Sequence, residues 1–253
     1  MRDFQQERAA TKARIRRRGI YLLPNLFTTA ALFAGFYSIV QAMNQRFEDA
    51  AIAIFVAMVL DGLDGRVARL TKTQSAFGAE YDSLSDMVSF GAAPALVMYE
   101  WALRPMDKLG WVAAFVYVAG AALRLARFNT NIDVVDKRFF QGLPSPAAAA
   151  LVAGVIWVAH AFNLTTVAER WIGIVITLYA GLSMVSNVPF YSGKSINLRR
   201  SIPFVVVLLL VLAFALLSIH PPLVLFLCSV FYGTSGYVYW LWRWTRRRRS
   251  ASA

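Results

Sequence analysis

Apolar runs long enough to cross a membrane recur along the chain, and they constrain its fold more than any other feature. A transmembrane α-helix needs about 20 predominantly apolar residues. Runs such as FVVVLLLVLAFALL do not alternate apolar and polar residues as barrel strands do. We therefore predict an all-α fold, a polytopic integral membrane bundle of about eight transmembrane helices. The expected spans lie at about 20–42, 49–69, 84–103, 109–128, 145–163, 170–190, 202–219 and 222–242.

The positions of lysine and arginine predict the orientation of this bundle. Of the 26 basic residues, 22 lie in the terminal segments or near the connections after the second, fourth and sixth spans. Basic residues mark the cytoplasmic side of a membrane protein. We therefore expect both termini in the cytoplasm, which agrees with an even number of spans. The remaining basic residues, expected on the opposite side, are Arg46, Arg104, Lys108 and Arg170.

The net charge of +12 also bears on possible partners. Basic residues near a membrane surface attract anionic lipid headgroups by about 1 kcal/mol each, so these lipids are candidate partners besides the topological explanation. Nucleic acid is not expected, because the chain has no basic groove studded with aromatic residues outside its apolar runs.

Four aspartates stand in DGLDGRVARLTKTQSAFGAEYDSLSD, residues 61–86, between the second and third apolar runs. Asp61 and Asp64 are three residues apart, and Asp82 and Asp86 are four apart. On helices each pair therefore projects from one face. A short connection favours neighbouring helices, so we expect the four carboxylates to converge at the cytoplasmic membrane face, where charged groups are costly and mark functional sites.

Two kinds of positive charge would offset the repulsion among these carboxylates. Arg66 and Arg69 are close enough in sequence to form ion pairs, with Lys72 nearby, and the cluster would then be structural. Two arginines do not neutralise four acids, whereas carboxylate oxygens suit Mg²⁺, Mn²⁺ or Ca²⁺. Two such ions would stabilise the attacking and leaving oxygens of a displacement at phosphorus.

The stretch DGLDGRVAR, followed after eight residues by GAEYDSLSD, resembles the signature of the CDP-alcohol phosphotransferases in every fixed position. Members of this family move a phosphatidyl group from CDP-diacylglycerol, or a related CDP-linked donor, to an alcohol and release CMP. The resemblance implies two divalent cations, Mg²⁺ or Mn²⁺. One would be held by Asp61, Asp64 and Asp82, and the other by Asp61, Asp82 and Asp86. Asp86 would also be the general base.

The resemblance implies a binding site for the CDP-lipid beside these acids. Gly65, Arg69 and Ser75 would hold the cytidine diphosphate, and Asn25 and Thr28 of PNLFT would line the same pocket. PNLFT is alternatively only a proline that starts a helix, with polar neighbours. The small residues Ala68 and Gly78 would let the ligand approach the backbone, although small residues also serve helix packing in membranes.

Within this family the chain is most similar to the phosphatidylserine synthases. The similarity is carried by LPNLFTTAALFAGF, YDSLSDMVSFGAAPA, RLARFN, FQGLPSPAA and GLSMVSNVPFYS. It implies L-serine as acceptor, whose carboxylate needs a cation. Arg124 and Arg127, with Asn129, are candidates because an arginine fork matches a carboxylate; ordinary positive-inside anchors are the alternative. Ser186 is a further candidate, although ending the sixth span is its other role.

We divide the chain into a basic cytoplasmic segment (1–19), a catalytic core of about six transmembrane helices (20–195), two further transmembrane helices (196–243) and a basic cytoplasmic tail (244–253). The resemblance implies a homodimer in a bacterial inner membrane, with the site facing the cytoplasm. Transfer of the phosphatidyl group to L-serine has three alternatives. They are transfer to another acceptor (glycerol phosphate, an inositol compound or choline), an ion or proton transporter with intramembrane acids, and a non-catalytic family member. Four intact aspartates argue against the last.

Overall fold

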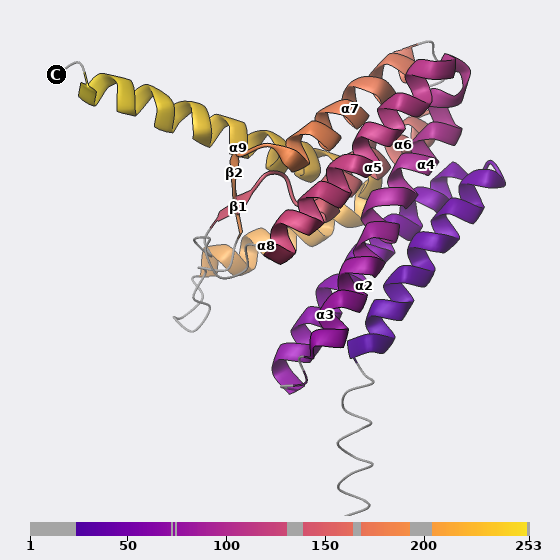
Figure 1. Ribbon diagram of the computed structural model, residues 1–253, viewed down its shortest axis with the longest axis horizontal. Coiled ribbons are helices and arrows are strands. Elements are labelled where there is room, and N and C mark those ends of the chain that lie inside the picture. The colour runs from indigo at the N-terminus through magenta and orange to yellow at the C-terminus, as the bar shows by residue number, and fades with distance from the viewer. Residues whose placement is uncertain are drawn as a thin grey trace, which may run out of the picture.

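The computed structural model describes residues 24–71, 73, 75–130, 139–163, 168–192 and 204–251. Nearly all of this part of the chain is helical, and long helices pack side by side into a bundle (Figure 1). The prediction of an all-α membrane protein is therefore confirmed. The expected N-terminal segment 1–19 lies outside the described residues.

The first two helices form a hairpin. The first helix, Pro24–Met43, is followed by a tight turn in which Gln45 has φ 62°, and by α2 (Phe47–Thr71). Hydrogen bonds from Thr28 to Asp64 and from Arg46 N to the Gln41 carbonyl hold the two helices together at opposite ends of the hairpin. The turn places the N-terminal end of the first helix beside the C-terminal end of α2, where the acids lie.

The third pass through the bundle is an interrupted helix. It begins with α3 inside the aspartate motif, widens into π-helical turns in two places and closes with a short 3-10 turn. The chain then reverses at Asp107, which has φ 48°, into a long helix that packs back along it. The bounds are α3 Ala76–Asp86, η1 Met87–Ala92, α4 Ala93–Met98, η2 Tyr99–Leu103, η3 Arg104–Met106 and α5 Asp107–Thr130.

Two helices and a small strand pair follow. Helix α6 (Ser145–Ala161) packs against α2, α7 and α9, and α7 (Ala168–Val185) packs against α5. The segments flanking this helix pair, β1 (Phe139–Gln141) and β2 (Pro189–Tyr191), form an antiparallel ladder. This ladder, which hydropathy did not indicate, joins the connection before α6 to the connection after α7.

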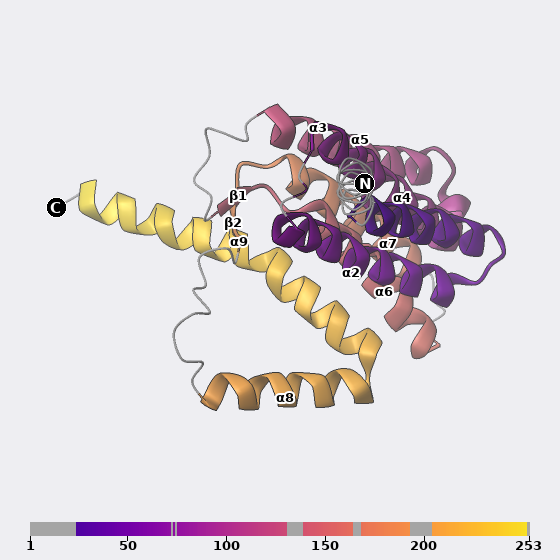
Figure 2. The same ribbon diagram turned by 90° about the horizontal axis from the view of Figure 1, so that it is seen from below.

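The last two helices lie to one side of the bundle. Helix α8 (Phe204–Ile219) packs against α9 (Pro221–Ala251), and Figure 2 shows it set apart from the other helices. Helix α9 crosses the bundle at α6 and then extends away from it. Because α9 continues to Ala251, the described part of the expected basic tail is helical.

Several helices have the length and composition of membrane spans. Four segments qualify among the described residues: Pro24–Met43, Ala76–Thr130, Ala168–Val185 and Pro221–Arg246. Ser145–Ala161 and Val206–Ile219 are shorter apolar helices, and Ala76–Thr130 includes the reversal at Asp107. The expected number of eight spans and the orientation of the termini stay predictions.

Small residues make the centre of the bundle. Helix α6 buries Ala148, Ala149, Val152, Ala153 and Ile156, and it contacts helices on several sides. Small side chains allow close approach of helix backbones, which drives helix association in membranes. The large apolar side chains left on the outer surface of this bundle suit contact with lipid.

Candidate active site

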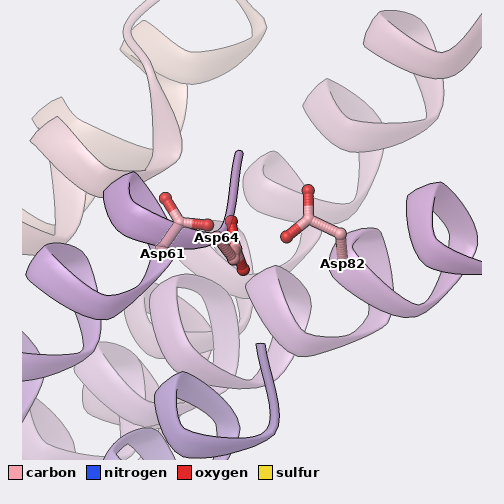
Figure 3. A group of neighbouring side chains, drawn as sticks. All are labelled: Asp61, Asp64 and Asp82. Atoms are coloured by element: carbon pink, nitrogen blue, oxygen red, sulfur yellow. The ribbon is translucent and has the colours of Figure 1, made fainter. Parts of the chain in front are cut away.

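Three aspartates converge at the end of the bundle where α2 meets α3. Asp61 and Asp64 come from α2 and Asp82 from α3, and Figure 3 shows their carboxylates pointing toward one another. One oxygen from each lies within 4.8 Å of the others. Asp64 is buried, and Asp61 and Asp82 are partly buried. The structure thus brings together three of the four aspartates that the sequence singled out.

Asp86, the last residue of α3, joins this group through Asp61. The carboxyl groups of Asp61 and Asp86 lie within hydrogen-bonding reach of each other, as do those of Asp64 and Asp82. Two ionised carboxylates repel at such separations, so each pair requires a shared proton or a bridging cation. The four acids therefore form one connected cluster with Asp86 at its inner edge.

The cluster fits a hard divalent cation better than it fits arginine partners. Among the described residues, the salt bridges are Arg46–Asp49 and Arg104–Glu100, and neither involves the cluster. Arg69 acts on Asp64 only as a more distant charge. The buried Oδ1 of Asp82 has no hydrogen-bond partner among these residues. Converging carboxylate oxygens with an unsatisfied buried atom have the donor chemistry that Mg²⁺ or Mn²⁺ prefers.

Thr28 fixes the orientation of one acid. Its hydroxyl lies 2.8 Å from Oδ2 of Asp64, to which it donates, and 3.2 Å from the Pro24 carbonyl. Both Thr28 and Asp64 are almost fully buried. Groups that hydrogen-bond to metal-binding carboxylates orient them, so the structure gives Thr28 a supporting position as well as a place on the cavity wall.

A cavity of about 330 Å³ opens beside the acids, between the first helix, α2 and α3. This volume is at the lower end of the range for small-molecule sites. All seven residues expected to contact the CDP-lipid line it: Asn25, Thr28, Gly65, Ala68, Arg69, Ser75 and Gly78. Asp64 and Asp82 also line it, and sequence reasoning missed Pro24, Thr73 and Ala79, each of which is adjacent to a predicted residue or inside the motif.

Ser75 and Gly78 build the far wall of this cavity as the start of α3. The Gly78 N–H donates to Ser75 Oγ at 3.0 Å, so Ser75 caps the helix. Gly78 thus lies in the first turn of α3. A Cβ at Gly78 would stand 3.1 Å from Ser75 Oγ and 3.5 Å from Asn25 Oδ1 on the facing helix, so glycine leaves more room for a ligand at this point of the cavity.

Arg124 is a buried cation that is not among the residues lining this cavity. It is 8% exposed, and it interacts electrostatically with Asp86. One guanidinium nitrogen donates to Ser145 Oγ at 2.8 Å. Its buried Nε has no hydrogen-bond partner among the described residues. Arg124 therefore keeps a donor available inside the protein, and its charge acts on Asp86, the residue that the family resemblance implies as the base.

Arg127, one turn along α5, is differently placed. Its two terminal nitrogens donate to the side-chain oxygen of Asn187 and to four backbone carbonyls. Three of those carbonyls, of Met184, Val185 and Ser186, lie at the C-terminal end of α7, where helices leave carbonyls unpaired. Arg127 thus ties α5 to the end of α7 and, through Gln141, to β1.

Asn129 and Ser186 are the other two residues expected to contact the L-serine acceptor. The Asn129 amide donates to Ser83 Oγ at 3.1 Å, directly beside Asp82 in sequence. The Ser186 hydroxyl donates to the Ser183 carbonyl at 2.8 Å and thus helps to end α7. Arg124, Arg127, Asn129 and Ser186 are called the acceptor group below.

A π-helical turn directly after Asp86 is a feature that sequence reasoning missed. Three hydroxyls hold this region: Ser85 donates to the Thr28 carbonyl, Ser89 to that of Ala31, and Tyr117 to that of Phe90. All three side chains are buried. Hydropathy does not distinguish a π turn from an α turn, so the only sequence signal was the run of buried hydroxyl residues in apolar surroundings.

Comparison with known proteins agrees with this geometry. Residues 21–182 match the family model of the CDP-alcohol phosphatidyltransferases. A CDP-diacylglycerol–serine O-phosphatidyltransferase of Helicobacter pylori (strain J99) is 37% identical over 197 residues, which cover 77% of this chain and 82% of the relative. Proteins with the same name from Mycobacterium leprae and Methanocaldococcus jannaschii are 32% identical over 218 residues and 33% identical over 189 residues. These alignments cover 84% and 73% of this chain, and 72% and 82% of the relatives.

Proposed function

The chain belongs to the CDP-alcohol phosphatidyltransferase family, and from this premise we propose that it transfers the phosphatidyl group of CDP-diacylglycerol to L-serine. The products are phosphatidylserine and CMP. The observation that carries the reaction class is the convergence of Asp61, Asp64 and Asp82 beside a cavity that the motif residues line. L-Serine as the acceptor is supported by the names of the relatives and by the buried cation Arg124.

The aspartate cluster is the proposed site of two divalent cations, Mg²⁺ or Mn²⁺. Asp61, Asp64 and Asp82 would hold one ion, and Asp61, Asp82 and Asp86 the other. Bound there, the ions would neutralise the charge of the diphosphate and of the departing CMP. Thr28 supports this arrangement because its hydroxyl holds Asp64 in place.

The cavity beside the cluster is the proposed site of the CDP part of the donor. Arg69, on the exposed rim, offers a planar fork to phosphate oxygens. Gly65 and Gly78 have no Cβ on the cavity wall, so a ligand reaches the backbone there. The acyl chains would stay in the surrounding lipid, because a cavity of about 330 Å³ is too small to hold them.

On the acceptor side, Asp86 would take the proton from the L-serine hydroxyl as its oxygen attacks the phosphorus that carries diacylglycerol. A P–O bond forms to serine, the P–O bond to CMP breaks, and CMP leaves. Arg124 would bind the serine carboxylate through its available Nε donor. Arg127, whose nitrogens already donate to several acceptors, would position Ser186 and the end of α7 beside the substrate, and Asn129 would supply a further polar contact.

The proposed setting is a bacterial inner membrane, with both termini and the cluster facing the cytoplasm. The distribution of basic residues supports this orientation. Three further features complete the proposal: anionic lipid headgroups bound by the basic segments, a homodimeric assembly, and a core domain that ends near residue 195. Accessibility of single cysteines placed at the two ends of the bundle, together with the mass of the purified protein, would test orientation and assembly.

An assay of CMP release tests the function. Purified protein receives CDP-diacylglycerol with L-serine, glycerol phosphate, inositol phosphate or choline in turn, with and without Mg²⁺ or Mn²⁺. We expect CMP and phosphatidylserine only with L-serine and a divalent cation. CMP release with another alcohol alone would keep the reaction class and replace the acceptor. Ion flux through reconstituted protein, without CMP release, would instead support a transporter.

A further inference from the structure

We propose that helix α9, which lies beyond the family-matched segment, positions the acceptor group and thereby sets the affinity for L-serine. This inference rests on the function proposed above. The family model matches residues 21–182, whereas the end of α7, β2 and α9 follow that segment in the chain. Their contacts connect α9 to the acceptor side of the cluster in three steps.

The first step is the attachment of the end of α7 to α5. Arg127 donates to the carbonyls of Met184, Val185 and Ser186, and to the Asn187 side chain. These bonds fix residues 183–191, called the hinge segment here, to the helix that carries Arg124. The position of the hinge segment therefore sets where Ser186, the member of the acceptor group outside α5, lies relative to the arginines of α5.

The second step is the connection between β1 and α6, whose backbone donates to the hinge segment. The Gly142 N–H donates to the Val188 carbonyl and the Leu143 N–H to the Ser183 carbonyl, both at 2.9 Å. Gly142 has φ 78°, and a Cβ there would stand 2.3 Å from the Met184 carbonyl oxygen. Only glycine combines this conformation with this contact, so the hinge segment has a defined path.

The third step is the packing of the hinge segment on α9. The Phe190 ring is fully buried, with its centroid 5.9 Å from that of Tyr232 and 6.1 Å from that of Tyr237. The Tyr232 hydroxyl donates to the Tyr191 carbonyl at 3.1 Å, and the Tyr237 hydroxyl lies 2.7 Å from Ser183 Oγ. Helix α9 therefore contacts the hinge segment at both of its ends.

Gly236 is the position on α9 that admits Phe190. A Cβ at Gly236 would stand 2.6–2.7 Å from three atoms of the Phe190 ring. The Phe190 ring is fully buried, and the carbonyls of Val188 and Tyr191 on either side of it accept hydrogen bonds. A shift of this ring is therefore expected to move β2 as well. Tyr232 also contributes to the electrostatic environment of Arg124, the cation proposed for the serine carboxylate.

These contacts make Gly236, Tyr232 and Tyr237 positioning residues for the acceptor. The donor cavity lies elsewhere, between the first helix, α2 and α3, and its lining in the described part of the chain includes no residue of α9. A displacement of the hinge segment should therefore weaken the binding of L-serine and leave the binding of CDP-diacylglycerol as it is. This split between the two substrates distinguishes positioning from a general loss of structure.

The test compares Gly236→Ala with Gly233→Ala in the full-length protein. At Gly233, one turn earlier on α9, a Cβ would stand 3.1 Å from the flexible end of Leu151 and in ordinary contact, at 3.8 Å, with the Tyr179 hydroxyl. For Gly236→Ala we expect the KM for L-serine to rise about tenfold through overpacking, with an unchanged KM for CDP-diacylglycerol. Adding Phe190→Leu to Gly236→Ala makes room for the new methyl group and should recover much of the loss. Gly233→Ala should keep both KM values.

Tyr232→Phe keeps the inference testable if Gly236→Ala does not fold. It removes only the hydroxyl that donates to Tyr191, so we expect a rise of about threefold to tenfold in the KM for L-serine. An unchanged KM for L-serine in a folded Tyr232→Phe protein, or equal effects on both substrates, would overturn the inference. If the wild-type protein releases no CMP with L-serine, the proposed function itself fails, which is a separate result.

Discussion

Thr28 donates a hydrogen bond of 2.8 Å to Asp64, and both residues are buried. The bond links the first helix to the aspartate cluster on α2, so a residue of the PNLFT segment orients an acid 36 positions away.

Thr28→Val keeps the shape of the side chain and removes the donor to Asp64. Substitution of groups that orient metal ligands costs about 10–100-fold in metal affinity or activity. We expect the Mg²⁺ or Mn²⁺ concentration for half-maximal CMP release to rise within that range. Thr177→Val is the matched control, because Thr177 is equally buried and its hydroxyl donates within its own helix, to Gly173. An unchanged metal dependence in Thr28→Val would contradict the orienting role.

Asp86→Asn removes the proposed base but keeps the size of the side chain. We expect CMP release to fall by about 10²–10⁴-fold, the usual contribution of a general base. Asp107→Asn is the control: Asp107 lies in the α4–α5 reversal at φ 48°, which asparagine tolerates. Size-exclusion chromatography in detergent checks the fold. Near-normal CMP release by folded Asp86→Asn would exclude this residue as the base.

Metal removal is expected to lower thermal stability as well as activity. Without a cation the cluster holds repelling carboxylates, and a ligand that binds only the folded state stabilises by about 2.7 kcal/mol at 100 times its Kd. EDTA should therefore abolish CMP release and lower the Tm, and Mg²⁺ or Mn²⁺ should restore both. Asp82→Asn should lose most of the metal-dependent rise in Tm. A Tm that is indifferent to divalent cations would count against a metal site.

Arg127→Lys and Arg124→Lys should have different consequences. Arg127→Lys loses the planar fork that reaches carbonyls on α7 and β1, and each hydrogen bond lost costs about 0.5–1.5 kcal/mol. We expect a clear drop in the Tm of Arg127→Lys in detergent. Arg124→Lys should mainly raise the KM for L-serine. The same pattern in both variants would mean that the two arginines share one role.

Tyr117→Phe removes the hydroxyl that donates to the Phe90 carbonyl in the π-helical turn at 3.0 Å. That carbonyl would then be buried without this donor, at a cost of about 1–3 kcal/mol. We expect a lower Tm and a lower kcat, because the turn follows Asp86 directly. Tyr99→Phe, in the second π-helical turn at the other end of the same pass, is the comparison. Equal effects of the two changes on kcat would contradict a specific link to Asp86.

The sequence supported the helices and the meeting of the aspartates because both follow from local periodicity. Apolar runs report burial in lipid whatever the details of packing, and spacings of three and four place acids on one face of a helix. The seven residues expected to contact the CDP-lipid line one cavity, and their binding of the ligand stays a prediction. Family resemblance supplied their expected roles.

Other features depend on contacts between distant segments, which no local pattern reveals. The β1–β2 ladder is three residues long on each side, too short for an alternating pattern. The guanidinium of Arg127 is committed to the end of α7, some 58 positions along the chain, whereas RLARFN alone does not separate Arg127 from Arg124. The π-helical turns also follow from packing rather than from hydropathy.

The π-helical turn Met87–Ala92 also sets the rotation of Asp82 and Asp86 on α3 relative to α4, which continues the same helical pass after the turn. Its Ala93 N–H donates to the Val88 carbonyl, five residues back, so the turn contains one residue more than an α-helical turn. One residue corresponds to about 100° of rotation in an α-helix. Deleting one residue here would leave a span of nearly the same length while turning Asp82 and Asp86 away from α2. The register of the helix, rather than its apolar character, therefore keeps the aspartates of α2 and α3 facing each other.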